Sequence, residues 1–484
     1  MKKTIIKYIV GVCAVWMTSS CDDYLDVQPM DKFLESQVFS TQIGVQNALN
    51  GIYLELNNNR AYGEDLTLGA VEALAQRYNQ PNSDQPLYLY QNYEYEEQPV
   101  MNKFESIWTR AYVNILNINA LLEGLDKYPG VLPQNEEDLV RGECYALRAF
   151  IHFDILRLFG GVPGQSMDDY QLPYYDGIKK EAAPLISGSL FLENVLSDLE
   201  MAEEFLADDP IVGNGKMLPD PDNGIVTFFM SRHLRMNLYA VKAMQARVNQ
   251  YAGNDLLALE AAEWVINNGS QWFPWTEPLA ILSTPDAPDL VFSSEVIFGT
   301  YNLNLYAKFN NLFNNNLQEN SVLYARPRRL DQTFENNEND YRFNSTWVLG
   351  SNHSFKTFNK YREPGNIGGD PPSFKYLLGL IRISEMYYIA AESLADSDPG
   401  QALVYLNTVR YNRGLEELAL GVDIQEEIMK EYRKEFFGEG QLFFYYKRHN
   451  FSSIPNGSSN TANNTMDENT YVVPLPLSEL EFRN

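Results

Sequence analysis

The feature that most constrains this chain is the stretch from Glu136 to Phe159, which is apolar on nearly every side of a helix. Asn135 is placed to cap that helix, acidic residues fill its first turn, and Gly160 ends it. Its apolar side chains are Leu139, Tyr145, Leu147, Phe150, Ile151, Phe153, Ile155, Leu156, Leu158 and Phe159. A helix with so little polar surface is normally surrounded by other helices, so the stretch predicts a large helical core.

A polar seam interrupts this apolar surface. Arg141, Tyr145, Arg148 and His152 follow one another at helical spacing. Because a buried arginine needs a partner, we expect Arg148 to meet a carboxylate from a neighbouring helix. No second acid or nucleophile accompanies the seam, which favours an architectural role over catalysis. Cys144, alone in the same helix, is interpreted as a small core residue.

Helical periodicity recurs before and after this stretch. It predicts helices over Asp31–Gly51, Leu66–Tyr78, Phe104–Leu125, Leu190–Leu206, Ile225–Val248 and Asp255–Asn267, and then over Phe374–Ala395, from Asp398, from Asp423 and over Glu439–His449. Their succession in pairs indicates degenerate helical hairpins of the tetratricopeptide kind. The predicted fold class is all-α, mostly helical with minor β structure.

One long segment does not follow the helical period. From Gln271 to Gly369, Pro, Asn and aromatic residues dominate. The segment is too long for a simple connection, which indicates a functional role. We predict a single domain over 21–484, in which a helical-pair scaffold (31–270 and 374–449) holds a loop-rich ligand-binding insert at about 271–373.

The N-terminus has the features of a secretory leader. Basic residues precede an apolar run over 8–17 that is too short for a permanent membrane helix. Small residues before Cys21 resemble a bacterial lipoprotein processing site, so we predict a signal peptide over 1–20 and acylation of Cys21. Several acyl chains together would anchor the protein stably. Asp22 and Asp23 resemble a surface-export tag, with a plain acidic tether as the alternative.

The charge of the chain excludes some partners. A formal net charge of −27 argues against nucleic acid and against an anionic membrane surface. Solubility explains most of this charge.

Motifs of catalysis are missing from the sequence. It contains no Gly-x-Ser-x-Gly, His-Glu-x-x-His, phosphate-binding glycine loop or Cys-x-x-Cys, and its four His are scattered. Glu427, Glu431 and Glu435 recur every four residues, and we interpret them as a solvated or salt-bridged helix face in preference to a glycosidase pair. We therefore expect no catalytic residue, no metal and no cofactor.

Several segments, in order along the whole chain, resemble the SusD/RagB family of surface nutrient-binding outer-membrane lipoproteins. They are Cys21–Pro29, Trp108–Asn119, Ala146–Phe150, Arg157–Pro163, Arg382–Glu392, Leu406–Arg410, Glu431–Gly440 and Pro474–Leu480. The resemblance implies a SusD-like fold on tetratricopeptide-like pairs, with loops that carry the ligand site and no catalysis. It also implies a partner, a SusC-like TonB-dependent outer-membrane barrel over which the protein acts as a lid. Members of the family bind oligosaccharides or oligopeptides.

Two loop regions hold the candidate binding residues. A neutral ligand that must later be released suits aromatic faces and amide side chains, which stack and hydrogen-bond without burying charge. The stretch Asn79–Pro99 reads as a loop or short strand pair rich in such residues, and the insert offers the same mixture. The candidates are Tyr78, Gln80, Tyr88, Tyr90, Tyr93, Tyr95, Trp272, Trp275, Tyr301 and Asn302. The alternative is that half or more of these aromatics pack the loops onto the helices.

The class of ligand is inferred from loop composition. Tyr and Asn/Gln suit a peptide backbone, whereas Trp platforms, which are few here, suit sugars. The segment Gln441–Arg448 also lacks the Arg and Trp-Asp usual in the family. We therefore place an oligopeptide first and an oligosaccharide second. An all-helical glycoside hydrolase and a helical-repeat scaffold without a small ligand are the alternative functions.

Overall fold

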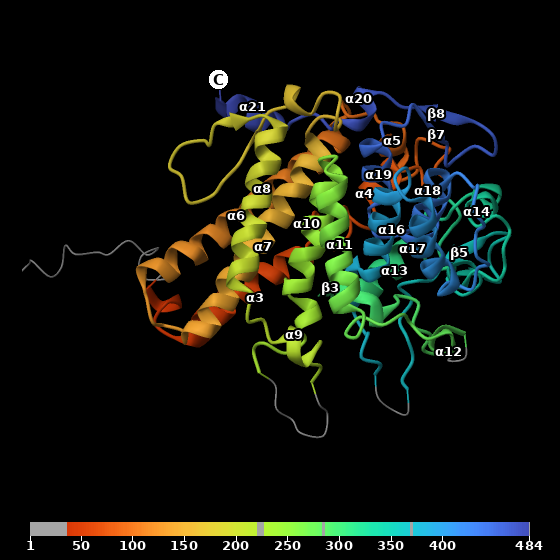
Figure 1. The fold of residues 1–484 in the computed structure, drawn as a ribbon. Coiled ribbons are helices and arrows are strands. Elements are labelled where there is room, and N and C mark those ends of the chain that lie inside the picture. The colour runs from red at the N-terminus through yellow and green to blue at the C-terminus, as the bar shows by residue number, and fades with distance from the viewer. Residues whose placement is uncertain (1–35, 220–226, 283–285, 368–370, 484) are drawn as a thin grey trace, which may run out of the picture.

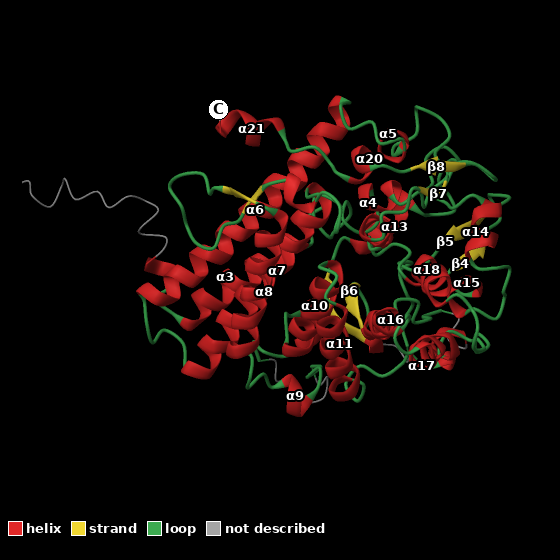
Figure 2. Cartoon of the chain, turned by 45° about the horizontal axis from the view of Figure 1, so that its top comes forward, coloured by secondary structure: helices red, strands yellow, loops and turns green. Residues whose placement is uncertain are grey.

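The computed structural model describes residues 36–219, 227–282, 286–367 and 371–483, so the predicted signal peptide and Cys21 lie outside the described residues. Long helices that lie side by side form most of the molecule (Figure 1), and strands are few and short (Figure 2). In chain order these helices are α3 (Gln42–Leu56), α6 (Gln98–Lys127), α7 (Gln134–Phe159), α8 (Gly188–Phe205), α10 (Leu238–Tyr251), α11 (Asp255–Gly269), α16 (Ile383–Leu394), α17 (Pro399–Tyr411), α18 (Ile424–Glu435) and α19 (Leu442–Arg448).

Helices that are neighbours in the chain pack against each other. The closest pairs are α6 with α7, α7 with α8, α10 with α11, and α16 with α17. The contact of α11 with α16 joins the two halves of the scaffold across the insert. This arrangement confirms the all-α fold of tetratricopeptide-like helix pairs.

The central helix α7 is buried along most of its length. Arg148 binds Asp198 of α8 through two hydrogen bonds, Nε to Oδ2 at 2.7 Å and Nη2 to Oδ1 at 2.5 Å, which confirms the expected carboxylate partner. Burial raises the pKa of the Cys144 thiol, in keeping with a core residue. The predicted cap at Asn135 is wrong, because the helix starts two residues earlier, at Gln134, and Pro133 occupies the capping position.

Other helix boundaries also differ from the predicted ones. Leu66–Tyr78 contains only the short helix α4 (Ala70–Leu74), and Gln76 just after it has a positive φ of 62° that no helix continues through. The helix predicted over Ile225–Val248 begins at Leu238, because the Asn237 side chain accepts a hydrogen bond from the N–H of Ala240. The predicted caps at Asp398 and Asp423 are confirmed.

In the described part of the chain, the strands form four two-stranded antiparallel sheets. They are β1 (Leu172–Pro173) with β2 (Leu185–Ile186), β3 (Val296–Tyr301) with β6 (Leu377–Arg382), β4 (Trp347–Leu349) with β5 (Lys356–Phe358), and β7 (Ser453–Pro455) with β8 (Asn463–Thr465). The helix predicted from Phe374 is therefore wrong over β6, a fully buried strand. A short apolar run buried on both faces shows no alternation that would distinguish strand from helix.

The remaining elements are short. They are α5 (Tyr88–Gln91), η1 (Met167–Asp169), α9 (Ile211–Asn214), η2 (Arg232–Leu234), α12 (Pro278–Leu282), η3 (Ser293–Glu295), α13 (Leu305–Leu312), α14 (Pro327–Thr333), α15 (Tyr341–Asn344), α20 (Glu468–Tyr471) and α21 (Leu477–Arg483). The segment Asn79–Pro99 contains α5, turns and the start of α6, so of its two predicted alternatives the loop agrees with the structure and the short strand pair is wrong. No helix in the described ranges is long and apolar enough to cross a membrane.

A buried ionic network fastens the insert to the C-terminal helices. Arg342 of α15 donates to both Glu431 and Glu435 of α18, each at 2.8 Å. Burial alone would raise the pKa of Glu431, but Arg342, Lys434 and Arg410 hold it at about 2. The predicted salt-bridged helix face is confirmed for Glu431 and Glu435 of α18. The alternative, a solvated helix face, is wrong for these two residues.

Candidate ligand-binding site

The two loop regions expected to carry the site meet at Asn79 and Tyr324. The N–H of Asn79 donates to the Tyr324 carbonyl at 2.8 Å, and its Nδ2 donates to the Tyr324 hydroxyl at 2.6 Å. The loop between β7 and β8 joins them, since the Gln80 N–H donates to Ser458 Oγ at 2.8 Å and Arg326 Nη1 donates to the Ser458 carbonyl at 3.1 Å. Three segments far apart in sequence therefore converge on one face of the molecule.

A cavity of about 300 Å³ opens beside this junction. It lies between the segment after α4, helix α14, the end of α18, helix α19 and the loop after β7. Its lining residues are Ala75, Gln76, Arg77, Ala325, Arg329, Leu330, Gln332, Thr333, Arg433, Phe437, Leu442, Tyr446, Pro455 and Gly457. The volume is at the lower end of the range typical of small-molecule sites.

The floor of the cavity is held by hydrogen bonds of Gln76. Its Nε2 donates to the Gln91 carbonyl at 2.6 Å, and its Oε1 accepts from the Gly457 N–H at 3.2 Å. A Cβ at position 457 would collide with the Gln76 carbonyl oxygen, so only glycine allows the two backbones to approach this closely. Tyr93 lies behind Gln76, whose Nε2 is 3.1 Å from the Tyr93 hydroxyl.

Three arginines line the cavity. Arg329 Nε donates to the carbonyls of Asn456 and Ser459, which fixes its guanidinium against the β7–β8 loop. Arg433 is half-buried, and its Nε donates to the Tyr446 hydroxyl at 2.8 Å. No Asp or Glu is among the lining residues.

The third arginine, Arg77, is almost completely buried. Its Nη1 donates to the Arg433 carbonyl at 2.6 Å, its guanidinium stacks 4.7 Å from the centre of the Phe437 ring, and its Nη2 has no hydrogen-bond partner among the described residues. Glu72 lies behind it, with Oε2 at 3.5 Å from Arg77 Nε. Burial raises the pKa of Glu72 to about 7, so this carboxylate neutralises Arg77 only partly at neutral pH.

The candidates of the first loop region are mostly internal. Tyr78, Gln80, Tyr90 and Tyr95 are buried, and Tyr88 and Tyr93 are half-buried. The Tyr78 hydroxyl donates to the Leu68 carbonyl at 2.6 Å, and the Tyr95 hydroxyl to the Thr470 carbonyl at 2.8 Å. For these two tyrosines the structure agrees with the alternative that they pack the loop onto the helices.

The candidates of the insert lie elsewhere. Trp272 Nε1 donates to the Val212 carbonyl at 3.2 Å, and Trp275 packs on Tyr387. Tyr301 lines a different pocket, beside α3 and η2, and is 47% exposed as a residue, and Asn302 next to it is buried. The structure therefore does not bring the candidates of the two regions together.

Composition did not single out the residues that do line the cavity. Arg77, Arg329, Arg433 and Tyr446 come from four separate segments, and of these only Arg433 lies in a family-like segment, Glu431–Gly440. The available signal was the run Arg326-Pro-Arg-Arg329, a basic cluster in a chain with 64 acidic and 37 basic residues.

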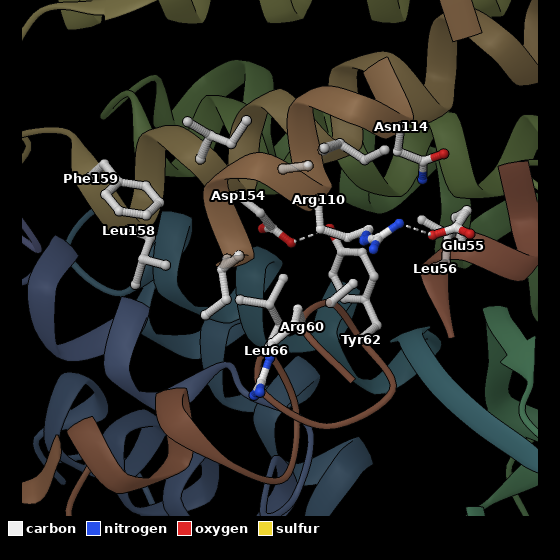
Figure 3. A pocket seen from close by; sticks show the side chains of 15 residues that line it. Glu55, Leu56, Arg60, Tyr62, Leu66, Arg110, Asn114, Asp154, Leu158 and Phe159 are labelled. Carbon is white, nitrogen blue, oxygen red and sulfur yellow. Dashed lines mark hydrogen bonds and ion pairs between the residues drawn. The ribbon is translucent and has the colours of Figure 1, made fainter. Parts of the chain in front are cut away.

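Another pocket, between α3, α6 and α7, offers little room. Figure 3 shows two of its polar pairs, with Arg110 bound to Glu55 and the Tyr62 hydroxyl to Asp154. Its volume of about 20 Å³ is enough for about one water molecule. In the described part of the chain no cluster of His, Cys, Asp or Glu could hold a metal ion.

A scaffold of paired helices with a cavity lined by loops is typical of helical-repeat binding proteins. A family model described as starch-binding and associating with the outer membrane matches residues 23–214, and the SusD family model matches residues 358–475. Together these segments cover more than half of the chain. The chain belongs to the SusD family.

Individual relatives agree with this assignment. SusD-like protein P2 of Formosa agariphila is 25% identical over 282 residues, which are 57% of this chain and 49% of the relative, so the match spans about half of the relative's length. A SusD superfamily protein of Bacteroides thetaiotaomicron has the same fold, with a TM-score of 0.69 and 20% identity over 91% of this chain and 98% of its own. Surface glycan-binding protein A of the same species, in complex with laminarihexaose, gives a TM-score of 0.66 and 19% identity over 91% and 98% of the two chains.

Proposed function

We propose that this protein is a lipid-anchored cell-surface lipoprotein that captures an oligomeric nutrient and acts as the lid of a SusC-like TonB-dependent outer-membrane transporter. The family assignment supports the location and the partner. The complex of a protein of the same fold with laminarihexaose supports a sugar ligand. An oligosaccharide therefore takes first place, and the oligopeptide favoured by loop composition becomes the second ligand.

The observation that carries the proposal is the cavity beside the Asn79–Tyr324 junction. Its walls combine the rings of Tyr446 and Phe437 with the amide of Gln332, while Gln76 is held by its own hydrogen bonds to Gln91 and Gly457. Rings offer a face for the C–H groups of a sugar, and amides donate to and accept from hydroxyl groups. This is the chemistry of reversible binding.

The cavity gives less support to a glycoside hydrolase. Such enzymes need two carboxyl groups beside the substrate, one of them with a raised pKa so that it can act as an acid. No carboxylate lines this cavity. Glu431 and Glu435 are buried in ion pairs with arginines, which lower their pKa values and leave no proton to donate at neutral pH.

Two experiments test the proposal. Solubilised native membranes should yield the protein together with a large β-barrel protein, and recovery of a barrel-free monomer would contradict the role as a lid. Calorimetry of the purified protein with oligosaccharide and oligopeptide mixtures should show binding without any cleavage product. Cleavage detected by mass spectrometry would favour the hydrolase instead.

The anchor needs a separate test. Mass spectrometry of the mature N-terminus should find acyl chains on Cys21, and Cys21→Ala should release the protein from the membrane fraction. An unmodified Cys21 would contradict the anchor while leaving ligand capture open.

A further inference from the structure

The cavity is positively charged in a strongly acidic protein. The chain carries 64 acidic and 37 basic residues, yet the cavity lining contains Arg77, Arg329 and Arg433 and no acidic residue. A cluster of like charges costs free energy unless a counter-charge joins it. The electrostatic repulsion is visible at Arg329, whose pKa is lowered by burial and by Arg433, Arg328 and Arg326.

Two of these arginines have donor atoms without a hydrogen-bond partner among the described residues. Arg77 Nη2 is buried at the cavity without a hydrogen-bond partner in the described chain. Among the described residues, Arg433 has a hydrogen-bond partner only at Nε, the Tyr446 hydroxyl, which leaves its two Nη atoms for a ligand. Arg329 is committed to the β7–β8 loop and contributes charge more than free donors.

Their geometry suits a planar or tetrahedral anion. The Arg433 carbonyl accepts from Arg77 Nη1 at 2.6 Å, so the two residues are held next to each other from α18 and from the segment after α4. A guanidinium binds the oxygens of carboxylate or sulfate with paired N–H groups more strongly than it binds neutral hydroxyls. The Phe437 ring lies 4.7 Å from the Arg77 guanidinium and the Tyr446 ring 5.5 Å from that of Arg433, so both cations also rest against aromatic rings.

From this combination of a cavity, three arginines, unpaired donors and no lining carboxylate, we infer that the cavity binds an anionic unit of the captured oligosaccharide, a sugar that carries a carboxylate or a sulfate group. The inference rests on the proposed function, which supplies the oligosaccharide. Beyond that function, the ligand carries a negative charge, and Arg433 and Arg77 are the residues that select it.

Calorimetry on the full mature chain tests this inference with three probes of equal length: hexameric oligogalacturonate, neutral laminarihexaose and a hexaglutamate peptide. Oligogalacturonate should bind more tightly than laminarihexaose, and its affinity should fall as NaCl is raised.

Two variants test the role of Arg433. Arg433→Gln should lower the affinity for oligogalacturonate by about tenfold or more, because a hydrogen bond to a charged group is lost. Arg110→Gln removes the same charge from a surface ion pair outside the cavity and should change the affinity less than about twofold. Matching thermal melts of both variants would show that each is folded.

The outcomes separate the two proposals. If laminarihexaose binds and oligogalacturonate does not, or if Arg433→Gln has no effect, the anionic ligand is overturned and sugar capture stands. If only the hexaglutamate peptide binds, the assignment to a sugar is overturned. If none of the three probes binds, neither the inference nor the proposed oligosaccharide capture survives.

Discussion

Arg413 and Glu295 form a fully buried double hydrogen bond across 118 positions of sequence, Nη1 to Oε1 at 2.9 Å and Nη2 to Oε2 at 2.6 Å. Arg413 follows α17 in the C-terminal scaffold, and Glu295 ends η3 just before β3 in the insert. Glu435 of α18 accepts from the same guanidinium at 2.6 Å. One arginine therefore connects the insert with two helical pairs.

This relationship predicts a large stability cost for Glu295→Gln. The substitution keeps the shape of the side chain but leaves Arg413 buried with less counter-charge, and breaking such a pair costs about 3–5 kcal/mol. Urea denaturation of the variant should show a loss of this size in the free energy of unfolding.

The matched control is Glu55→Gln in the surface pair with Arg110, where both side chains are more than a third exposed. It should cost less than about 1 kcal/mol. Equal losses for the two variants would show that burial of the Glu295 pair does not matter.

At Gly142, replacement by alanine should destabilise the packing of α7 although alanine has the higher helix propensity. In α7 a Cβ at this position would lie 2.5 Å from Leu206 Cγ, so Gly142→Ala should destabilise the contact of α7 with α8 by about 1–3 kcal/mol. At Gly51 in α3 a Cβ meets nothing within 4 Å, so Gly51→Ala should stabilise the protein by about 0.5–1 kcal/mol. Thermal melts should shift in opposite directions, and a shift in the same direction would refute the close packing at Gly142.

Glu72 predicts a pH dependence of stability. Burial raises its pKa in the folded protein from the ordinary 4.5 to about 7, so between these pH values the folded chain keeps a proton that the unfolded chain has lost. Its contribution to stability is therefore present below pH 4.5 and is lost as pH rises to about 7. The loss is on the order of 3 kcal/mol.

Other carboxyl groups titrate in the same window, so the measurement compares the protein with Glu72→Gln. The free energy of unfolding of the unaltered protein should fall relative to that of the variant as pH rises from 4.5 to 7. A constant difference between the two would mean that Glu72 keeps an ordinary pKa in the fold.

The contacts of Tyr78 predict that its substitution lowers stability and leaves ligand binding unchanged. It is fully buried and donates to the Leu68 carbonyl, so Tyr78→Phe should lower the free energy of unfolding by about 1–2 kcal/mol while the affinity for oligosaccharide stays unchanged. Tyr88→Phe, at a half-buried ring in the same segment, should stay within about 0.5 kcal/mol. A loss of affinity in Tyr78→Phe would return this residue to the ligand site.

Sequence reasoning was most successful where a property follows from the residue itself. An apolar helix containing Arg148 required a buried counter-charge, and Asp198 of α8 supplies it. Asp398 and Asp423 cap helices because a short carboxylate accepts from free N–H groups wherever a helix begins. It was least successful at the binding residues, because an aromatic side chain serves a core and a binding surface equally well. The burial of Tyr78 and Tyr95 could not be inferred from composition.

The sequence by itself determined the helical scaffold, the need for a buried partner at Arg148, and the family, because apolar periodicity, capping residues and ordered motifs are properties of local segments. Only the tertiary structure decided which residues face the cavity. Arg77, Arg329 and Arg433 lie far apart in the chain, and the loop around Gly457 reaches them only after the scaffold has folded. The charge of that cavity depends on the distances between side chains in the folded protein, and these distances cannot be derived from the order of residues in the sequence.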